Sequence, residues 1–383
     1  MQQYMNRALL GLLPSGIRAF TALAKQTPGC TLLTIGEPDF STPEAITARA
    51  QAALDAGMTH YPANCGDMAY RNAVADFENR SYGYDYLPEE VILTTGATEA
   101  LFVALQGTLN PGDEVLIPTP AFGLYESIVR LSNAVPVRID TTETDFVLTA
   151  QALQEHLTDK TRMLILNTPN NPTGCVYTDD ELREIHDVLV GKPIFVVCDD
   201  VYRQLSYQPM HSLAQFRDLR KQLLVVQSFS KPYAMTGWRL GYLMGDKPII
   251  EKLTLLHAAC VVSIPAFCQP ACEVAFSQTQ QVAEMVQTYQ QRRDYIDARL
   301  REMGLPAKKP GGAFYIFPDI RKFGMSSEDF CRRMILEGKV AGVPGSCFGA
   351  EGFVRFSFCY DLEEIRRGMD KLERFVKQIG ETT

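Results

Sequence analysis

The sequence predicts an α/β fold, with a large domain built on a mostly parallel sheet covered by helices and a smaller α+β domain. Three observations lead to this prediction. Short apolar runs alternate with helical patterns through the middle of the chain, these runs are apolar on both faces, and polar side chains follow directly where they end. Strands that are apolar on both faces are typical of parallel sheets covered by helices.

The predicted strands of the large domain are five apolar runs, at residues 91–94, 114–117, 163–166, 194–198 and 223–226. Helical patterns separate most of them. The polar side chains that follow their carboxyl ends are Thr98, Asn171, Asp199, Tyr202, Ser228, Ser230 and Lys231. Because ligands of such sheets bind at the carboxyl ends of the strands, we expect these side chains to share one site.

Helices are predicted between these strands and through the C-terminal part of the chain. Their expected ranges are 43–55, 68–82, 99–109, 247–256, 282–302, 327–337 and 362–379. Proline in the first turn marks the start of the first of them. A strand at 353–358, together with a turn and strand at 310–317, gives the C-terminal part an α+β pattern.

Composition narrows the class of protein. A chain of 383 residues is too long for a domain with one ordinary hydrophobic core, so we expect two domains or one large α/β domain. Hydrophobic residues make up 46% and charged residues 21%, as in soluble globular proteins. The net charge of −8 argues against nucleic acid as the main partner. No apolar run is long enough for a membrane span, and the first residues lack the pattern of a signal peptide.

The cysteines and histidines predict no metal site. None of the ten cysteines forms a Cys-x-x-Cys pair, and the five histidines are scattered. Several cysteines, such as Cys198, lie in apolar runs and are interpreted as buried free thiols. Free thiols suit a reducing compartment, so we expect a cytoplasmic protein.

A polar loop after the last of the five strands carries the strongest chemical signal. It contains Ser228, Ser230, Lys231 and Arg239. Lysine is the side chain that forms Schiff bases with carbonyl compounds, and arginine can bind phosphate through two parallel hydrogen bonds. The loop therefore suits a covalently bound carbonyl cofactor with a phosphate tail.

The pattern Ser-Phe-Ser-Lys-x-x-x-Met-x-Gly-x-Arg, from Ser228 to Arg239, resembles the cofactor-attachment signature of class I and II aminotransferases of the aspartate aminotransferase superfamily. These fold type I enzymes use pyridoxal 5'-phosphate (PLP). The resemblance covers nearly the whole chain. It implies a large PLP-binding domain over residues 41–281 and a small domain made of 1–40 and 282–383, joined by the helix at 282–302.

The resemblance also implies a role for each cofactor-binding residue. Lys231 forms the Schiff base, Asp199 keeps the pyridine nitrogen protonated, and Tyr202 and Asn171 bond to the phenolic oxygen of the ring. The catalytic residues so implied are Lys231, Asp199 and Tyr202. The phosphate is expected at a helix N-terminus and at the lysine loop, on Gly96, Ala97, Thr98, Ser228, Ser230 and Arg239.

Further matches concern the ring, the substrate and a partner chain. Phe122 matches the aromatic residue that stacks on the cofactor ring. The substrate-binding residues implied are Gly36, Asn171 and Arg355, where Arg355 makes two bonds to the α-carboxylate. Tyr61 matches a tyrosine that reaches the phosphate of the neighbouring subunit, which implies a homodimer with shared active sites.

Several of these residues have a simpler interpretation. Asn171 is also a turn residue, Tyr202 and Tyr61 also fit as packed tyrosines, and Arg355 also fits a structural ion pair. For Asn171 and Tyr202 the simpler interpretation is weakened, because each follows a buried strand at the same edge of the sheet.

The predicted function is transfer of an amino group between an α-amino acid and a 2-oxo acid. A PLP-dependent C–S β-lyase on the same fold is the alternative, and a non-catalytic aminotransferase-like regulatory domain is a weaker one. In one branch of the resembled family, a lysine directly after the two-glycine turn binds the distal carboxylate of acidic substrates, and this chain has Thr98 at that place. We therefore expect neutral or aromatic donors, with Arg18 as the residue that would reverse this expectation.

Overall fold

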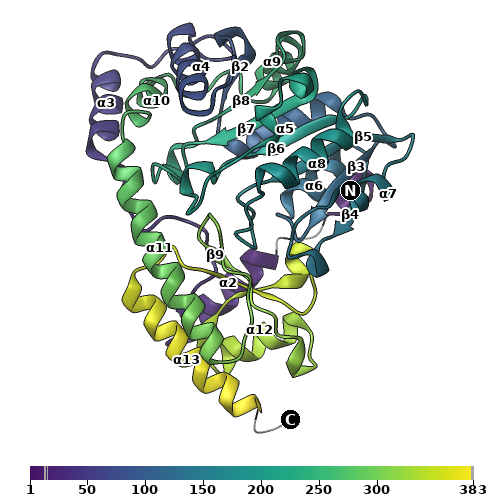
Figure 1. Cartoon of the computed structure of the whole chain (residues 1–383). Coiled ribbons are helices and arrows are strands. Elements are labelled where there is room, and N and C mark those ends of the chain that lie inside the picture. Colours follow the sequence, from purple (N-terminus) through teal and green to yellow (C-terminus); the bar gives the residue numbers. More distant parts are fainter. Residues whose placement is uncertain (13, 15, 381–383) are drawn as a thin grey trace.

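The computed structural model describes residues 1–12, 14 and 16–380. Figure 1 shows an upper part that contains a seven-stranded sheet and a lower part that contains two small sheets packed against helices. Helix α11 (Thr279–Glu302) runs from the upper part into the lower part. The predicted α/β class with a large, mostly parallel sheet is confirmed. The domain boundaries at residues 40/41 and 281/282 stay a prediction.

The large sheet has the strand order β2-β8-β7-β6-β5-β3-β4. Strands β3 to β7 pair in parallel, whereas β8 runs antiparallel to both of its neighbours. The strands are β2 (Val91–Thr94), β3 (Glu114–Thr119), β4 (Val135–Asp140), β5 (Thr161–Asn167), β6 (Phe195–Asp199), β7 (Leu223–Ser228) and β8 (Gly241–Gly245).

The sequence predicted β2, β3, β5, β6 and β7 and missed edge strand β4 and internal strand β8. Strands β2, β7 and β8 are buried at every position, which is why β2 and β7 appeared as continuous apolar runs. Strand β4 lies at one edge of the sheet. Most of its residues are exposed or half-buried, so it does not appear as a continuous apolar run.

The lower part contains two small sheets. Strands β1 (Thr31–Leu32) and β10 (Val340–Ala341) pair in parallel. Strands β11 (Val343–Pro344), β12 (Val354–Ser357) and β9 (Tyr315–Ile316) form an antiparallel sheet in that order. N-terminal and C-terminal segments are therefore joined in one small core, and this arrangement brings residues 31–36 next to Arg355.

The helices agree with the predicted positions within a few residues at most ends. The largest differences are that α9 continues to Val261 rather than 256 and that α11 begins at Thr279 rather than 282. The helices besides α11 are α1 (Arg7–Leu10), α2 (Gly16–Gln26), α3 (Glu44–Asp55), α4 (Met68–Tyr82), α5 (Ala97–Thr108), α6 (Leu124–Leu131), α7 (Ala150–Glu155), α8 (Asp179–Leu189), α9 (Lys247–Val261), α10 (Gln269–Ala275), α12 (Ser327–Leu336) and α13 (Leu362–Gly380).

Local sequence accounts for where several helices begin and end. The Thr178 hydroxyl accepts a hydrogen bond from the backbone N–H of Glu181, and the Glu181 carboxylate accepts one from the backbone N–H of Thr178. This capping box starts α8. Gly83 ends α4 in the left-handed conformation, with φ of 71°. The sequence prediction included α4 but not α8.

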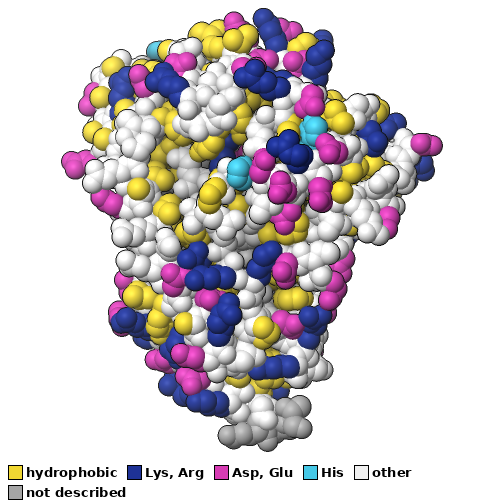
Figure 2. Space-filling view, viewed as in Figure 1, with side chains coloured by type: hydrophobic (Ala, Val, Ile, Leu, Met, Phe, Trp, Pro, Cys, Tyr) yellow, Lys and Arg dark blue, Asp and Glu magenta, His cyan; other side chains and the backbone are white. Residues whose placement is uncertain are grey.

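Acidic and basic side chains are mixed over the face shown in Figure 2, in the lower part most clearly. No described helix is long and apolar enough to cross a membrane. Among the described residues, no group of three or more His, Cys, Asp or Glu side chains is arranged to hold a metal ion.

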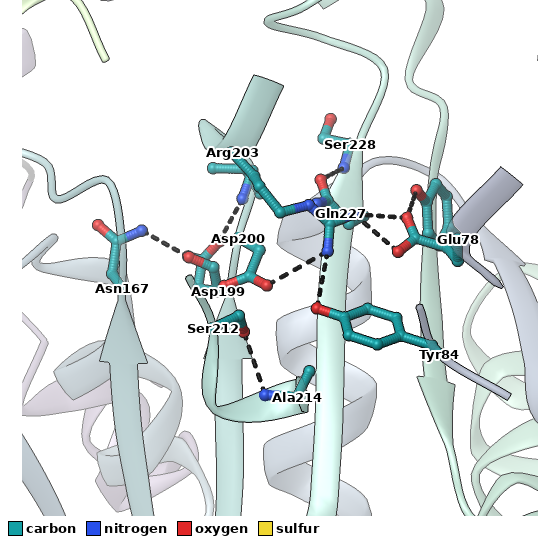
Figure 3. Close-up of polar contacts among 12 residues, drawn as sticks. Glu78, Tyr84, Asn167, Asp199, Asp200, Arg203, Ser212, Ala214, Gln227 and Ser228 are labelled. Carbon is teal, nitrogen blue, oxygen red and sulfur yellow. Dashed lines mark hydrogen bonds and ion pairs between the residues drawn. The ribbon is translucent and has the colours of Figure 1, made fainter. Parts of the chain in front are cut away.

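A buried ion pair joins helix α4 to the turn that follows β6. Arg203 makes two hydrogen bonds to the Glu78 carboxylate, at 2.6 and 2.7 Å, and both side chains are almost fully buried. Figure 3 shows Arg203 between Glu78 and Asp200, whose carboxylate lies 3.6 Å away. The hydroxyl of Tyr242 also donates to Glu78. The backbone N–H of Arg203 also donates a hydrogen bond to the backbone carbonyl of Asp200. The residue that forms the ion pair therefore also closes the turn after β6.

We expect Arg203→Met to lower the free energy of unfolding by about 3–5 kcal/mol, because it leaves the Glu78 charge buried without its partner. The double variant Glu78→Leu/Arg203→Met should lose less than the sum of the two single variants, since it removes both charges. Chemical denaturation of all four proteins measures this coupling. Additive losses would show that the two side chains do not act as a pair.

Candidate active site

A cavity of about 580 Å³ lies between the carboxyl ends of the large-sheet strands and the lower part of the molecule. The structure brings together at this cavity most of the residues predicted for the site. They are Gly36, Ala97, Thr98, Phe122, Asn171, Asp199, Tyr202, Ser228, Ser230, Lys231, Arg239 and Arg355. Helix α2 and Tyr315 complete much of the remaining wall. The roles assigned to these residues stay predictions.

Lys231 lies directly after β7, and its amine is held inside the cavity. Its Nζ donates a hydrogen bond of 2.6 Å to the carbonyl of Gly36. Burial lowers the pKa of the amine from its usual 10.5 to about 8. A larger share of the amine is therefore neutral near pH 7 than for an exposed lysine, and only the neutral form attacks a carbonyl carbon.

Asp199 ends strand β6 with its carboxylate buried. Burial raises the pKa of this carboxyl from 3.8 to about 6, and a hydrogen bond of 2.5 Å from the Tyr125 hydroxyl opposes the shift. Asn167 holds the backbone of Asp199 through a bond of 2.7 Å from its side-chain amide (Figure 3). The carboxylate is thus fixed at the floor of the cavity, available to one cationic partner.

Asp200, its neighbour, is turned away from the cavity. It belongs to the buried cluster with Arg203 shown in Figure 3 and does not line the cavity. Burial raises the pKa of its carboxyl to about 7, although the nearby Arg203 opposes the shift. The alternation of side chains along a strand explains why one acidic residue faces the cavity and the next faces the opposite side.

An anion-binding arrangement lies where α5 begins. The first turn of α5 carries unpaired N–H groups at Ala97 and Thr98, and the guanidinium of Arg239 lies beside it. Gly96 has φ of 80°, and a Cβ atom there would lie 2.6 Å from Nη2 of Arg239. Gly96 does not line the cavity itself. Its missing side chain lets Arg239 approach the helix start.

Arg355 is buried and points into the cavity from strand β12. Its Nη1 donates to Oδ1 of Asn171 at 2.9 Å, and its Nη2 donates to the carbonyl of Thr34 at 2.5 Å. Its Nε has no hydrogen-bond partner among the described residues. It forms no ion pair with any residue that the structure describes, so the charge of this buried guanidinium is left for a ligand.

Tyr202 and Tyr315 form a pair of hydroxyls beside Arg355. Their oxygens are 2.9 Å apart, and the guanidinium carbon of Arg355 lies 4.5 Å above the ring of Tyr315. A Cβ atom at Gly36 would lie 1.8 Å from the hydroxyl of Tyr315. The chain can pass under the cavity at this point only because residue 36 is glycine.

Tyr61 is a predicted site residue that lies away from the active-site cavity. It is 85% exposed and lines a different cavity, together with His60 and residues of the 263–267 segment. The prediction placed it at the site of a neighbouring subunit, and it stays a prediction.

Sequence reasoning missed Tyr125 and Tyr315. Tyr125 lies three residues after Phe122, on the first turn of α6, so a search for aromatic side chains near the cavity strands would have found it. Tyr315 directly follows the Gly-Gly-Ala-Phe segment and carries no local signal for its contact with Tyr202, because 113 residues separate them.

Comparison with known proteins gives consistent matches over the chain. The family model of class I and II aminotransferases matches residues 28–372. The chain is 41% identical to the aromatic-amino-acid aminotransferase 2 of Thermococcus litoralis, over 95% of this chain and 96% of that protein. It is 39% identical to the aspartate aminotransferase of Pyrococcus abyssi, over 95% and 96% of the two chains.

Solved structures agree with the sequence matches. The aromatic aminotransferase of Pyrococcus horikoshii superposes with a TM-score of 0.89 at 39% identity, covering 94% of this chain and 99% of that one. The aspartate aminotransferase of Thermus thermophilus, solved with maleate, gives a TM-score of 0.92 at 33% identity, covering 97% and 99%.

Asp199 makes stability depend on pH in the cofactor-free protein. Because its folded-state pKa is raised to about 6, its stabilising contribution is fully present below about pH 3.8 and is lost as pH rises through about 6. Asp199→Asn has no charge to bury, so we expect its free energy of unfolding relative to wild type to rise by about 2–3 kcal/mol between pH 4 and pH 8.

Chemical denaturation of both cofactor-free proteins across this range measures the difference. Glu181→Gln is a matched control, since its carboxylate caps the start of α8 away from the cavity. A difference between Asp199→Asn and wild type that does not change with pH would contradict the raised pKa.

Proposed function

Because the chain belongs to the class I and II aminotransferases, which are PLP-dependent enzymes, we propose that its 580 Å³ cavity binds PLP and that the predicted site residues act on it. The observation that carries the proposal is the cavity itself. It joins a partly neutral lysine, a buried carboxylate, a helix start beside an arginine, and a buried arginine without a carboxylate partner.

The residues present fit this cofactor. The N–H groups of Ala97 and Thr98 and the side chains of Ser228, Ser230 and Arg239 suit its phosphate. Asp199 supplies a buried negative charge for a protonated ring nitrogen, and Phe122 offers a flat apolar face for the ring. The opening between these groups includes the Lys231 amine, which can reach an aldehyde carbon.

When bound, the cofactor supplies a reactive carbonyl and a ring that accepts electrons from the substrate Cα. The chain's own residues do the rest. Nζ of Lys231 would move a proton between the substrate Cα and the carbonyl carbon of the cofactor. Arg355 orients the substrate by two bonds to its α-carboxylate, and Tyr202 donates a hydrogen bond toward the ring oxygen. Both half-reactions use one α-carboxylate site, so a single Arg355 serves both.

We also propose neutral or aromatic amino acids as the preferred donors. Ile17, Leu101 and Phe122 give the cavity an apolar side, and Thr98 supplies no positive charge at the position after the glycine turn. Related proteins are named as aromatic-amino-acid and as aspartate aminotransferases, so both donor classes need testing. A C–S β-lyase would use the same cofactor residues, but the relatives give no support to that alternative.

The assembly proposed is a cytoplasmic homodimer in which Tyr61 reaches the phosphate of the neighbouring subunit. The 85% exposed side chain of Tyr61 supports this, because it is free to contact a neighbouring subunit. The ten cysteines are all free, in keeping with a reducing compartment.

Borohydride reduction of the purified holoenzyme should fix the cofactor to Lys231, because its amine is the reactive one in the cavity. Peptide mapping locates the label, and Lys231→Ala should lose it together with transaminase activity. Lys308→Ala changes a lysine outside the cavity and serves as the control. A label on any other lysine would overturn the assignment of Lys231.

Donor preference is tested by kcat/KM for phenylalanine, methionine and aspartate with a fixed 2-oxo acid. We expect phenylalanine or methionine to exceed aspartate by about tenfold or more, since an unpaired distal carboxylate gains nothing from the apolar side of the cavity. Release of ammonia and pyruvate without a 2-oxo acid would instead identify a lyase. A clear preference for aspartate would contradict the donor proposal.

A further inference from the structure

A buried histidine lies between the proposed phosphate site and the segment that carries Tyr61. His257 belongs to helix α9, which packs against α5 in the upper part (Figure 1), and its side chain is fully buried. Its Nδ1 lies 2.5 Å from a carboxylate oxygen of Glu99, and its Nε2 lies 2.7 Å from the carbonyl oxygen of Asn64. Both ring nitrogens are therefore used, each toward a different element.

The two contacts determine the protonation of the pair. A backbone carbonyl can only accept, so Nε2 of His257 carries a hydrogen and donates it to Asn64. Burial alone would raise the pKa of the Glu99 carboxyl, but hydrogen bonds from His257 and Thr95 lower it below its usual value. Glu99 is therefore a carboxylate, so Nδ1 carries a hydrogen as well. The pair joins a buried cation to a buried anion.

Glu99 belongs to the helix start that we assign to the phosphate. It lies in the first turn of α5, directly after Thr98. Its second carboxylate oxygen accepts hydrogen bonds from the backbone N–H and the hydroxyl of Thr95, at 2.5 and 2.8 Å. The carbonyl of Thr95 in turn accepts a hydrogen bond of 3.4 Å from Arg239. Glu99 thus holds the residue that Arg239 contacts.

A carboxylate at this place needs a counter-charge if the helix start is to bind phosphate. The dipole at a helix N-terminus stabilises a nearby anion, but two anions at one helix start repel each other. His257 supplies the positive charge that offsets Glu99. Without it, the phosphate would be opposed by a largely buried negative charge on the residue next to Thr98.

The other contact of His257 fixes the segment that carries Tyr61. Residues 56–67, all of which the structure describes, form no helix or strand. Asn64 attaches this segment to α9 and its end, through its carbonyl to His257 and through its side-chain amide to the carbonyl of Val262, at 2.8 Å. Val262 has φ of 65°, which a β-branched residue rarely adopts, so the backbone at this junction is tightly constrained.

We propose that His257 is a positioning residue for the cofactor phosphate. Through Glu99 it holds the phosphate-binding start of α5 and offsets the carboxylate charge there. Through Asn64 it fixes the segment whose Tyr61 serves the phosphate of the neighbouring subunit. The inference rests on the proposed function and deepens it. One side chain thereby supports two phosphate sites of the proposed dimer, that of its own subunit and that of the neighbour.

The test compares the binding of PLP and of pyridoxal, which lacks the phosphate, to the cofactor-free protein prepared from the holoenzyme. The measured quantity is the ratio of the pyridoxal Kd to the PLP Kd, and absorbance titration gives both values. A residue that only supports the fold changes both Kd values alike, whereas a residue that acts on the phosphate changes the ratio. The phosphorus NMR shift of bound PLP reports the phosphate environment independently.

Two substitutions of His257 separate its two contacts. Glutamine places its amide near Nε2 and keeps the bond to Asn64, whereas asparagine places its amide near Nδ1 and keeps the bond to Glu99. His257→Gln is expected to lower the ratio by about tenfold or more, because it leaves the Glu99 charge unpaired at the phosphate site. The double variant Glu99→Gln/His257→Gln should recover most of this loss, since the carboxylate is then absent.

His257→Asn should lower the ratio by about threefold, a smaller loss because the hydrogen bond to Glu99 remains. In a Tyr61→Phe background the same substitution should have a smaller effect, since the part that acts through the Tyr61 hydroxyl is already lost. His186→Gln is the matched control. His186 pairs with two carboxylates on α8 outside the cavity, so this variant should keep the wild-type ratio.

Equal changes of both Kd values in His257→Gln, with an unchanged ratio, would overturn the proposal. If His257→Gln does not fold, His257→Asn decides in its place, because it retains a hydrogen bond to the buried Glu99, and an unchanged ratio there has the same meaning. Failure of the proposed function looks different, since the wild-type protein would then bind neither PLP nor pyridoxal.

Discussion

The buried ion pair between Glu78 and Arg203 underlies the geometry of the catalytic edge. It connects helix α4 to the turn between Asp199 and Tyr202, two residues that must face the cavity at once. Asp200 uses the other side of the same turn, next to Arg203. One network inside the upper part therefore holds Asp200 on the side away from the cavity, while Tyr125 and Asn167 hold Asp199 on the cavity side.

Much of the fold and of the candidate site could be predicted, because the decisive signals were local. Buried parallel strands appear as continuous apolar runs, and Asp199 and Lys231 stand directly after two of them. Strand β4 was missed because most of its residues are exposed or half-buried, so it forms no continuous apolar run. The hydrogen bond from Tyr125 to Asp199 and the contact of Tyr315 with Tyr202 could not be predicted, since each joins residues that are far apart in the chain.

Burial acts in opposite senses on the two central groups of the site. Removing water lowers the pKa of Lys231 to about 8 and raises that of Asp199 to about 6, because it disfavours whichever form carries the charge. In both groups the neutral form is thereby favoured. A single physical cause, exclusion of solvent, thus acts on a lysine and a carboxyl group of one cavity.

The cavity wall is divided between the two parts of the molecule. Lys231 and Asp199 come from the upper part, whereas Arg355, Tyr315 and helix α2 come from the lower part. A ligand that contacts Lys231 and Arg355 together therefore adds a non-covalent cross-link between parts that already share a hydrophobic cluster and backbone hydrogen bonds, such as those from Gly311 and Gly312 to the carbonyl of Gly174. Because the ligand binds only the assembled cavity, its binding stabilises both parts together and couples their unfolding more tightly.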